Sequence, residues 1–397
     1  MTRSVVVTGV GCLGAFGTGL DALAAALAAG QPLASPLDRS AGYHRAHGAT
    51  LVASAAGLDL SPWLSPQAAR RMSDLSQFAV AAARMAIQHA GLPDVRGDRT
   101  AIVLATALGP GGFTEQLARQ ILDKGGRAAS PFLFTDCVAN AAAGQVGIDL
   151  GARGPNITLC QREAGPVLAL AEGAREVALG RADVCLAGAV DEMKQLVHAL
   201  LDRFRALSRP GRFGEAPRPF DRRRDGALAG EGATVLVLEA EEHARARGAR
   251  VLARVGASVR AFDPTAGRAG FGRDAAGLAS VLRDRLGPAL ADVETVVSGA
   301  SGSRAGDALE AAVLRGVLPA GARLVAPKAV HGEFGGGTLA AALLALGGAT
   351  FGAPAHADEP DPALGVRLAH GRLDSRRVLL SALAAGGVAA WNLLELP

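Results

Sequence analysis

The stretch GPNITLCQREAGPVLALAEG, residues 154–173, has the pattern of a short strand, a tight turn and the start of a helix. A turn of this kind can present a catalytic nucleophile, because the helix N-terminus stabilises negative charge on the attacking group. The triplet at its centre, Gln161-Arg162-Glu163, supplies neither a thiol nor a hydroxyl. The sequence therefore predicts the framework of a nucleophilic site without the usual reagent.

The four cysteines offer no clear replacement. Cys12, Cys137, Cys160 and Cys185 are far apart and have no CxxC spacing or neighbouring histidine cluster, so they indicate neither a zinc site nor a disulfide framework. Cys160 lies three positions before Glu163, at the end of a predicted strand, and we expect its thiol to be buried among apolar side chains. We accordingly expect no metal and no cofactor.

The length of the chain favours two halves. With 397 residues it exceeds the size at which a single core stops growing, so we expect one half over residues 1–245 and a second over residues 246–397. The charged stretch 240–250 is predicted to be a helix that leads from one half to the other. The Arg-, Pro- and Gly-rich stretch 203–226 is expected to run over the surface.

The charge distribution argues against a nucleic-acid ligand. The net charge is +4, but the arginines are scattered through both halves and aromatic residues make up only 4% of the chain, whereas nucleic-acid binding favours a basic stripe interleaved with aromatics. An acidic protein partner fits this surplus better, and a solvated basic face is the alternative interpretation.

Nothing in the sequence indicates export or a membrane span. The N-terminal MTRSVVVTGVG begins a strand almost at once, without the pattern of a signal peptide. The Ala/Gly-rich stretch 338–350 is too short and too weakly apolar to cross a bilayer. We expect a cytoplasmic protein that has no membrane partner.

Short apolar runs alternate with helical segments, which predicts an α/β fold with a mostly parallel sheet. The predicted strands of the first half lie at residues 4–9, 101–106, 157–160, 184–189 and 234–239, and its helices at 66–91, 114–124, 139–151 and 164–180. The second half has predicted strands at 251–259, 294–301, 378–383 and 389–396 and helices at 274–286, 306–318 and 336–347. TAIVLATALGPGG in the first half and ETVVSGASGSRAG in the second echo each other as a strand that ends in a Gly-rich loop before a helix.

Several longer motifs resemble the β-ketoacyl synthases of the thiolase fold. The most specific is RPFDRRRDGALAGEGATVLVLE, and the others are VVVTGVG, LSQFAVAAARMAIQHAGL, VANAAAGQVGIDLGARGPN, GRADVCLAGAVDE, GDALE and PKAVHGEFGGG. The similarity covers nearly the whole chain. It implies a thiolase-like fold in which two pseudo-repeated α/β halves form α-β-α-β-α layers.

An active synthase of this family uses a cysteine thiolate that carries the acyl chain and two histidines that assist decarboxylation of the malonyl extender. By alignment with the family motifs, the cysteine position falls on Glu163 and the two histidine positions fall on Gly299 and Glu333, while Lys328 is retained. The resemblance therefore implies that this chain has no condensing activity of its own.

The polar residues around these positions have structural interpretations as well. His331, two residues before Glu333, could swing toward the cavity, although without a thiolate it would have nothing to assist. Glu163, Glu333 and Lys328 could instead form a buried ion-pair network that stabilises an otherwise empty pocket. The GDALE motif at residues 306–310 is kept intact.

One branch of the family resembles this chain in lacking the cysteine, namely the chain length factor, or ketosynthase β-subunit, of type II polyketide synthases. Its turn reads E-Q-A-G-G, and residues 162–166 are similar, with Glu163 in place of the Gln. Residues 383–389, LAAGGVA, also lack both phenylalanines of the gate loop F-G-F-G-G-T-N. The resemblance implies a non-catalytic subunit that forms a heterodimer with an active ketosynthase α-subunit and works with an acyl carrier protein.

In chain length factors, residues on the helix after ATALGPGG close the tunnel that receives the partner's growing chain. The resemblance assigns this role to Gly111, Thr114 and Ala118, whose small side chains would leave room for a long polyketide or polyene product. Tight helix packing in an Ala-rich protein explains the same small residues equally well.

The segment PFLFTDCVAN, residues 131–140, falls where the two subunits of such dimers face each other. Phe132, Leu133 and Phe134 are therefore expected at the partner interface, with packing in the chain's own core as the competing interpretation.

Two other functions stay open. One is a malonyl-acyl-carrier-protein decarboxylase that uses Glu163 to make a starter unit, although the loss of both histidines counts against it. The other is a homodimeric, non-catalytic scaffold.

Overall fold

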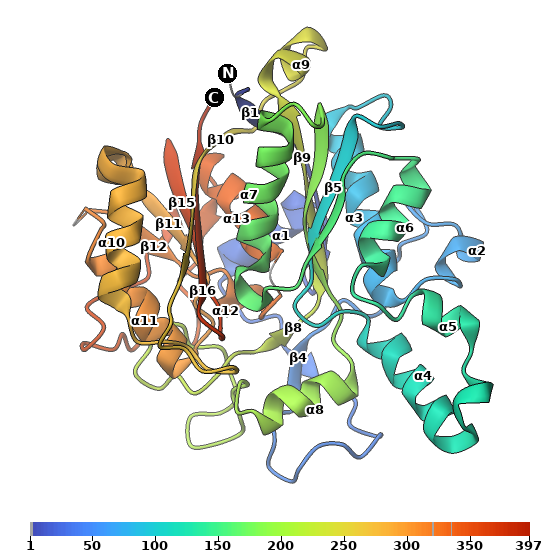
Figure 1. The fold of residues 1–397 in the computed structure, drawn as a ribbon. Helices are drawn as coiled ribbons and strands as arrows, with labels where there is room; N and C mark the ends of the chain where they lie inside the picture. The colour runs from blue at the N-terminus through green and yellow to red at the C-terminus, as the bar shows by residue number, and fades with distance from the viewer. Residues whose placement is uncertain (1–2, 320, 335) are drawn as a thin grey trace.

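The computed structural model describes residues 3–319, 321–334 and 336–397, and its main feature is an 11-stranded mixed sheet. The strands follow the order β12-β11-β15-β16-β10-β1-β9-β7-β5-β6, with β2 (Gly17–Thr18) paired to β1 outside this path. Strands β1 and β10 pair antiparallel over a short register, at Val6↔Arg254 and Val7↔Ala253. The sheet therefore consists of two halves that meet at one seam (Figure 1).

The two halves of the sheet repeat one topology. From the seam outward, the first contains β1 (Val5–Gly14), β9 (Gly232–Ala240), β7 (Val184–Asp191), β5 (Thr100–Ala105) and β6 (Asn156–Leu159). The second contains β10 (Ala253–Phe262), β16 (Val388–Glu395), β15 (Arg377–Leu383), β11 (Thr295–Ser298) and β12 (Arg323–Val325). In each half two antiparallel pairings are followed by two parallel ones. The two echoing segments of the sequence thus lie on the equivalent strands β5 and β11.

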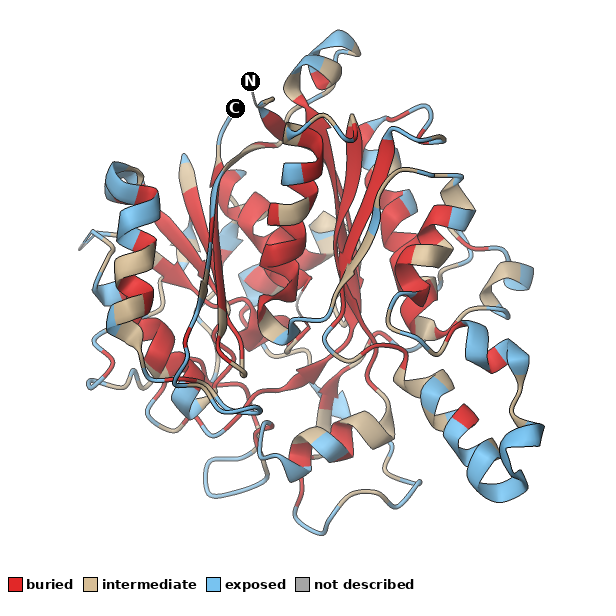
Figure 2. Cartoon of the chain, viewed as in Figure 1, coloured by how far each residue is buried: buried red, intermediate tan, exposed pale blue. Residues whose placement is uncertain are grey.

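Helices separate and cover the two halves. Between the halves lie α7 (Gly165–Ala178) and α13 (Gly337–Leu346), and each contacts strands from both. The outer face of the first half is covered by α3 (Asp74–Ala90) and α6 (Ala141–Leu150), and that of the second by α10 (Ala275–Leu286) and α11 (Arg304–Arg315) (Figure 1). Burial is greatest in the central strands and in the two helices between the halves, α7 and α13 (Figure 2). The predicted α-β-α-β-α layering is confirmed.

The remaining elements connect these layers. The helices are α1 (Leu20–Ala29), α2 (Pro66–Ala69), α4 (Gly111–Lys124), α5 (Pro131–Thr135), α8 (Gln195–Arg203), α9 (Glu241–Ala246) and α12 (Lys328–His331). A small sheet is formed by β3 (Ser35–Pro36), β4 (Leu51–Ala53) and β8 (Ala229–Gly230), and β13 (Thr350–Phe351) pairs with β14 (Gly371–Arg372). The predicted boundary between the halves falls within α9.

Strand β1 continues well past its predicted end at residue 9, through Gly9 and Gly11. Both glycines lie under α3, which approaches the strand very closely. An added Cβ would lie 2.3 Å from the Ala86 carbonyl oxygen at Gly9 and 2.1 Å from the Ala82 carbonyl oxygen at Gly11. These glycines therefore serve strand–helix contact, whereas the sequence pattern suggested the end of a strand.

The predicted helix over residues 66–91 is interrupted and forms α2 and α3. Ser73 starts the second helix, because its hydroxyl oxygen accepts a hydrogen bond from the Ser76 N–H at 3.3 Å. None of the helices in the described ranges combines the length and apolar character needed to cross a membrane.

The stretch 203–226 follows the surface only in its first part. Residues 216–221 are buried, and Phe220 packs into the core of the second half. The Phe220 N–H donates to Asp307 Oδ2 at 2.9 Å, which ties the segment to α11. The prediction of a continuous surface excursion was wrong here, because the large apolar side chain anchors a stretch that is otherwise rich in Arg and Pro.

Candidate functional site

Glu163 lies in a short 3-10 turn, Arg162–Ala164, that joins the end of β6 to the start of α7. Arg162 has a φ of 45°, in the left-handed region that a residue with a side chain rarely adopts, so the turn is strained. The predicted strand, turn and helix are all present. They place Glu163 at the N-terminus of α7, where its carboxyl reaches the loop between β15 and β16.

The turn holds both backbone groups of Ala385 in that loop. The Ala385 N–H donates to Glu163 Oε2 at 3.2 Å, and Arg162 donates a hydrogen bond of 3.5 Å to the Ala385 carbonyl oxygen. A backbone N–H aimed at this position could stabilise an oxyanion in an acyl-transfer reaction. In this chain the donor is already engaged by the Glu163 carboxyl.

An ion pair from the second half, between buried Lys328 and half-buried Glu333, lies close to Glu163. Lys328, at the start of α12, is 1% exposed, and its Nζ lies 2.5 Å from Glu333 Oε1. The Glu333 N–H donates to the Leu228 carbonyl oxygen at 2.7 Å, which holds the residue beside β8. The expected ion pair between Lys328 and Glu333 is present. Glu163 interacts with both residues through their charges, but its own hydrogen bond is with the backbone N–H of Ala385.

The environment of Glu163 favours its neutral form. Burial raises the pKa of Glu163 to about 7, and the negative charge of Glu333 acts in the same direction. Its backbone hydrogen bonds and the charge of Lys328 oppose this rise without cancelling it. Two carboxyls share the neighbourhood of a single ammonium group, so one of them keeps its proton near neutral pH.

Glu163→Gln is therefore expected to stabilise the protein in a pH-dependent way. Between the ordinary pKa of 4.5 and the raised folded-state pKa, the folded protein retains a proton that the unfolded chain releases, so wild-type stability falls as pH rises through this window. The neutral amide removes that loss, and we expect a gain on the order of 2 kcal/mol above the window and little change below it. Thermal melts across the pH range measure this. The control is Glu242→Gln, because Glu242 is exposed. If Glu163→Gln stabilised the protein equally at acid pH, the account would be refuted.

Gly299, at one histidine position, has no room for a side chain. It follows the end of β11, and an added Cβ would lie 2.9 Å from the Ser381 carbonyl oxygen and 3.2 Å from Ala382 Cα. Its N–H donates to Glu310 Oε1 at 3.3 Å. A histidine side chain here would require the end of β15 to move, so the packing around Gly299 does not admit one.

His331 does not replace the missing histidines. It is fully buried, its Nδ1 lies 2.9 Å from the Gly332 carbonyl oxygen, and its ring packs edge-on against Phe334. A Cβ on Gly337 would lie 2.5 Å from its Nε2, so α13 leaves the ring no space to turn. Burial lowers the pKa of His331 to about 4, which keeps the ring neutral. The swing toward the cavity is not available in this packing.

The retained GDALE motif serves the structure of the loops. Asp307 accepts hydrogen bonds from the N–H groups of Phe220 and, at 3.3 Å, Gly302. Glu310 accepts from the hydroxyls of Ser298 at 2.8 Å and Ser381 at 2.6 Å. Both acids are fully buried, so these bonds explain why the two residues are needed in a chain that lacks the histidines.

Cys160 differs from its prediction, because it is exposed. It follows β6, the last strand in the first half of the sheet, and no described segment of this chain pairs with the outer edge of that strand. Ile157 and Leu159 on the same strand are only half-buried. The apolar surroundings expected for the thiol would have to come from another molecule.

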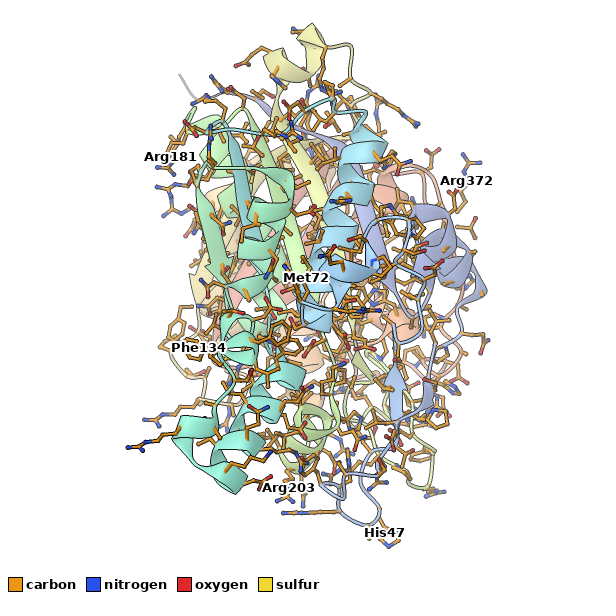
Figure 3. The ribbon with its side chains drawn as sticks, turned by 90° about the vertical axis from the view of Figure 1, so that its right-hand side faces the viewer. His47, Met72, Phe134, Arg181, Arg203 and Arg372 are labelled. Atoms are coloured by element: carbon orange, nitrogen blue, oxygen red, sulfur yellow. The ribbon has the colours of Figure 1, made fainter. Side chains whose placement is uncertain are left out.

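Two of the three predicted interface residues are exposed. Phe134 is 63% exposed and Phe132 is 46% exposed, whereas Leu133 is buried within its own chain. Figure 3 shows Phe134 on the outer side of the molecule, on the same side as the edge of the sheet. Other exposed apolar side chains lie on α4, α6 and the segment after α5, and together with the two phenylalanines they define the apolar face: Ile121, Leu122, Val138 and Ile148.

The three predicted tunnel residues share helix α4 but have different surroundings. A Cβ on Gly111 would lie 2.8 Å from Val197 Cγ2, so close packing against α8 explains this glycine. Thr114 and Ala118 are exposed, and the Thr114 hydroxyl donates to the Pro110 carbonyl oxygen at 2.8 Å. Space for a substrate can therefore exist at the last two positions only if another molecule forms the opposite wall.

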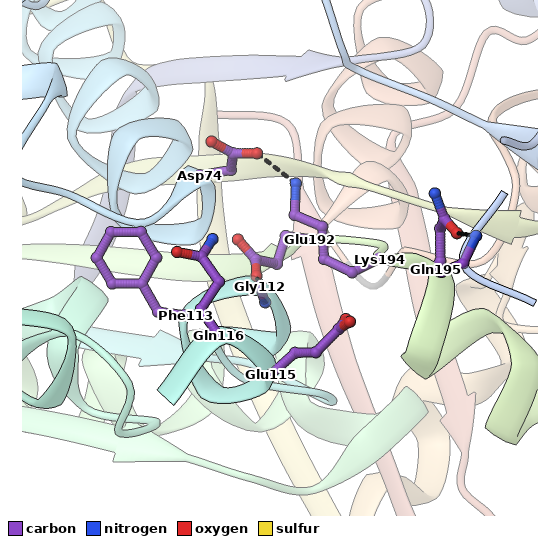
Figure 4. Close-up of a pocket in the computed structure, with 9 residues that line it drawn as sticks. Asp74, Gly112, Phe113, Glu115, Gln116, Glu192, Lys194 and Gln195 are labelled. Carbon is purple, nitrogen blue, oxygen red and sulfur yellow. Dashed lines mark hydrogen bonds and ion pairs between the residues drawn. The ribbon is translucent and has the colours of Figure 1, made fainter. Parts of the chain in front are cut away.

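Sequence reasoning missed a polar pocket of 340 Å³ on the other side of α4 (Figure 4). An ion pair between Lys194 and Asp74 crosses it. Glu192 is buried at its base and accepts hydrogen bonds from the N–H groups of Leu75 at 2.8 Å and Gly112 at 2.7 Å. The acidic and basic residues in VDEMKQ, directly after the apolar run of β7, were the available signal in the sequence.

The fold is that of the thiolase-like ketosynthases. The chain belongs to the β-ketoacyl synthase family, because the pattern of the β-ketoacyl synthase N-terminal domain matches residues 2–244. It is 34% identical over 258 residues to 3-oxoacyl-[acyl-carrier-protein] synthase 2 of Vibrio cholerae serotype O1, over 64% of this chain and 62% of that protein. The synthase 2 of Staphylococcus aureus strain N315 is 37% identical over 195 residues, 47% of this chain and 46% of that protein. The chain thus matches less than two thirds of the length of either relative.

Solved structures match over the full length. The ishigamide ketosynthase/chain length factor superposes with a TM-score of 0.89 at 28% identity, covering 100% of both chains. A β-ketoacyl synthase from Burkholderia phymatum has a TM-score of 0.88 at 23% identity, also over 100% of both chains. AntDE:AntF, a type II polyketide synthase acyl-carrier protein in complex with its ketosynthase, has a TM-score of 0.88 at 22% identity and the same coverage. The last two establish the fold.

Proposed function

We propose that this chain is a non-catalytic chain length factor in the cytoplasm, which pairs with an active ketosynthase α-subunit of a type II polyketide or polyene synthase and shapes the tunnel for the growing acyl chain. The observation that carries the proposal is Glu163, a carboxyl at the nucleophile position that already engages the Ala385 N–H. Gly299, which has no side chain, and Glu333, which is paired with Lys328, support it.

The chemistry of Glu163 argues against an acyl-carrying role. A carboxylate that attacks a thioester yields a mixed anhydride, which water hydrolyses readily, whereas a cysteine thiolate yields a stable thioester. The raised pKa of Glu163 also keeps much of it protonated near neutral pH, which lowers its nucleophilicity further. The thiolate of a condensing complex would therefore belong to the partner.

The apolar face and the open edge of β6 support pairing. Exposed large apolar side chains on neighbouring elements are typical of an interaction site, and an unpaired edge strand offers free backbone groups to another chain. Thr114 and Ala118 are exposed on α4, the helix that also carries Ile121 and Leu122 of the apolar face, where a partner could complete a tunnel wall. The match to the ishigamide ketosynthase/chain length factor supports the same role.

A second surface fits the acidic carrier protein. Residues 203–214, here called the Arg/Phe loop, expose Phe204 and Phe213, and Arg212 lies over the Phe213 ring at 5.3 Å from its centroid. Arg205, between the two phenylalanines in sequence, is exposed with a φ of 58°. Arginine and aromatic side chains are the commonest anchors of protein interfaces, and an acidic helix would complement this loop in charge.

The deciding experiment is co-expression with an intact ketosynthase, followed by size-exclusion chromatography with light scattering and a condensation assay. We expect a stable one-to-one complex that extends acyl chains equally well with wild-type chain and with Glu163→Ala. Complete loss of condensation in the Glu163→Ala complex, with the complex intact, would overturn the non-catalytic role.

One observation favours a second candidate, the malonyl-acyl-carrier-protein decarboxylase: Glu163 holds a proton near neutral pH and could deliver it to the carbanion left by loss of carbon dioxide. That function predicts carbon dioxide release by the chain alone and its loss in Glu163→Gln. A stable homodimer without either activity would instead identify a scaffold.

A further inference from the structure

Residues 38–49, here called the strap, form a long loop between β3 and β4 at the base of the molecule (Figure 1). The loop is closed at its neck, where the Leu37 N–H donates to the Thr50 carbonyl oxygen at 2.8 Å. Most of its residues are exposed or half-buried, and Gly48 and Ala49 are its buried members. A segment with so little buried apolar surface depends on its polar contacts to stay in place.

Hydrogen bonds connect the strap to two helices. On α8, Gln195 accepts from the Ala41 N–H at 2.9 Å and donates to Asp38 at 2.7 Å. On α4, Glu115 accepts from the Tyr43 hydroxyl at 2.5 Å, and Arg119 lies over the Tyr43 ring. Ala41 is one of the residues that line the 340 Å³ pocket described above. The strap therefore connects α4 with α8 and contributes Ala41 to the lining of the pocket.

Two histidines connect the centre of the strap to α8. His44 Nε2 lies 3.0 Å from Nδ1 of His198, which is fully buried on α8. The other ring nitrogen of His198 lies 3.1 Å from the Leu51 carbonyl oxygen, so it must carry the hydrogen. His198 Nδ1 consequently accepts from His44 Nε2, and both rings are neutral. The remaining nitrogen of His44, Nδ1, is buried and has no hydrogen-bond partner among the described residues.

The charges around the pair also favour the neutral rings. Burial is the main cause that lowers the pKa of both His44 and His198, and the positive charge of Arg39 on the strap acts in the same direction. Asp202 at the end of α8 opposes this, but its carboxylate is already bound by Arg209 at 2.7 Å and by the Ala49 N–H at 3.1 Å. At neutral pH the contact between His44 and His198 is therefore a hydrogen bond between two uncharged rings.

Acid removes this hydrogen bond. The two rings can share a first proton across the 3.0 Å contact, but after a second proton both facing nitrogens carry hydrogens and two cations meet. We propose that the strap is a pH-sensitive clasp, in which the contact between His44 and His198 holds residues 38–49 over α4 and α8 at neutral pH and releases them on acidification. Release would free Tyr43 from α4 and remove Ala41 from the lining of the pocket.

Hydrogen–deuterium exchange of the full-length chain at about pH 7.5 and about pH 5, corrected for the intrinsic pH dependence of exchange, tests the clasp. In the wild-type protein, protection of the strap amides is expected to fall about tenfold or more at the lower pH, with a smaller loss in the second half of α4. His44→Gln can still donate to His198 and cannot become charged, so its strap should stay protected at both pH values. His47→Gln, an exposed histidine on the same strap, is the matched control and should respond like the wild type.

Two results would overturn the proposal. One is equal corrected protection of the wild-type strap at both pH values. The other is an equal acid-induced loss in His44→Gln and in the wild type, which would assign the opening to other groups. Neither readout requires a ketosynthase partner or a carrier protein, so the clasp can fail while the proposed function stands, and the reverse also holds.

Discussion

Phe134→Asp will weaken the complex with an active ketosynthase by about 100-fold or more. The ring is 63% exposed in the isolated chain, so burying it against a partner contributes on the order of 2 kcal/mol, and a carboxylate in its place would be buried without a counter-charge. The folding of the chain itself should be little affected, because most of the side chain is exposed. Light scattering of co-purified chains and a titration of the partner measure the loss.

Phe213→Asp is the matched control, because Phe213 is 53% exposed but lies on the Arg/Phe loop. It should leave the ketosynthase complex intact and weaken binding of the carrier protein. Leu133→Asp should act differently from both, since Leu133 is buried and its replacement destabilises the chain before any partner is added. Retention of the complex by Phe134→Asp, together with its loss in Phe213→Asp, would move the interface away from the apolar face.

The layers of the fold could be predicted from the sequence because their signals are local. Continuous apolar runs such as TAIVLA are typical of strands buried on both faces, and both β5 and β11 lie where the repeated pattern places them. The end of β1 was wrongly predicted at Gly9, because a glycine that admits a neighbouring helix looks the same in sequence as one that ends a strand. Which of the two applies depends on α3, more than 60 residues away along the chain.

The position of the turn at Glu163 could be predicted from the sequence, whereas the contacts of the candidate site could not. The assignment of Glu163 to the cysteine position, and of Gly299 and Glu333 to the two histidine positions, comes from alignment with family motifs and stays a prediction. The engagement of Ala385 by Glu163 joins residues 222 positions apart, and no local pattern encodes it. Exposure of Cys160 was mispredicted for a related reason, since the end of an apolar strand is expected to be covered and the cover here does not come from the described chain.

Breaking the buried ion pair between Lys328 and Glu333 should produce the largest loss of stability in the isolated chain. Lys328→Met leaves the Glu333 carboxyl without its counter-charge and beside Glu163, and removal of one partner from a buried pair costs about 3–5 kcal/mol. The loss should grow with pH, because the charge of Lys328 lowers the pKa of Glu163, which would then have to ionise without the ammonium group. The double variant Lys328→Met/Glu333→Met should recover most of the stability, since two apolar side chains replace two desolvated charges.

Denaturant unfolding of the wild type, both single variants and the double variant forms a cycle that isolates the coupling between Lys328 and Glu333. The exposed pair Arg153 and Asp98 is the control, and Arg153→Met should cost less than about 1 kcal/mol because water screens both charges. Additive losses in the buried pair would show that each residue acts alone. A strong favourable coupling would show that Lys328 and Glu333 stabilise the fold as a pair, which is the structural role expected of them if the proposed non-catalytic function is right.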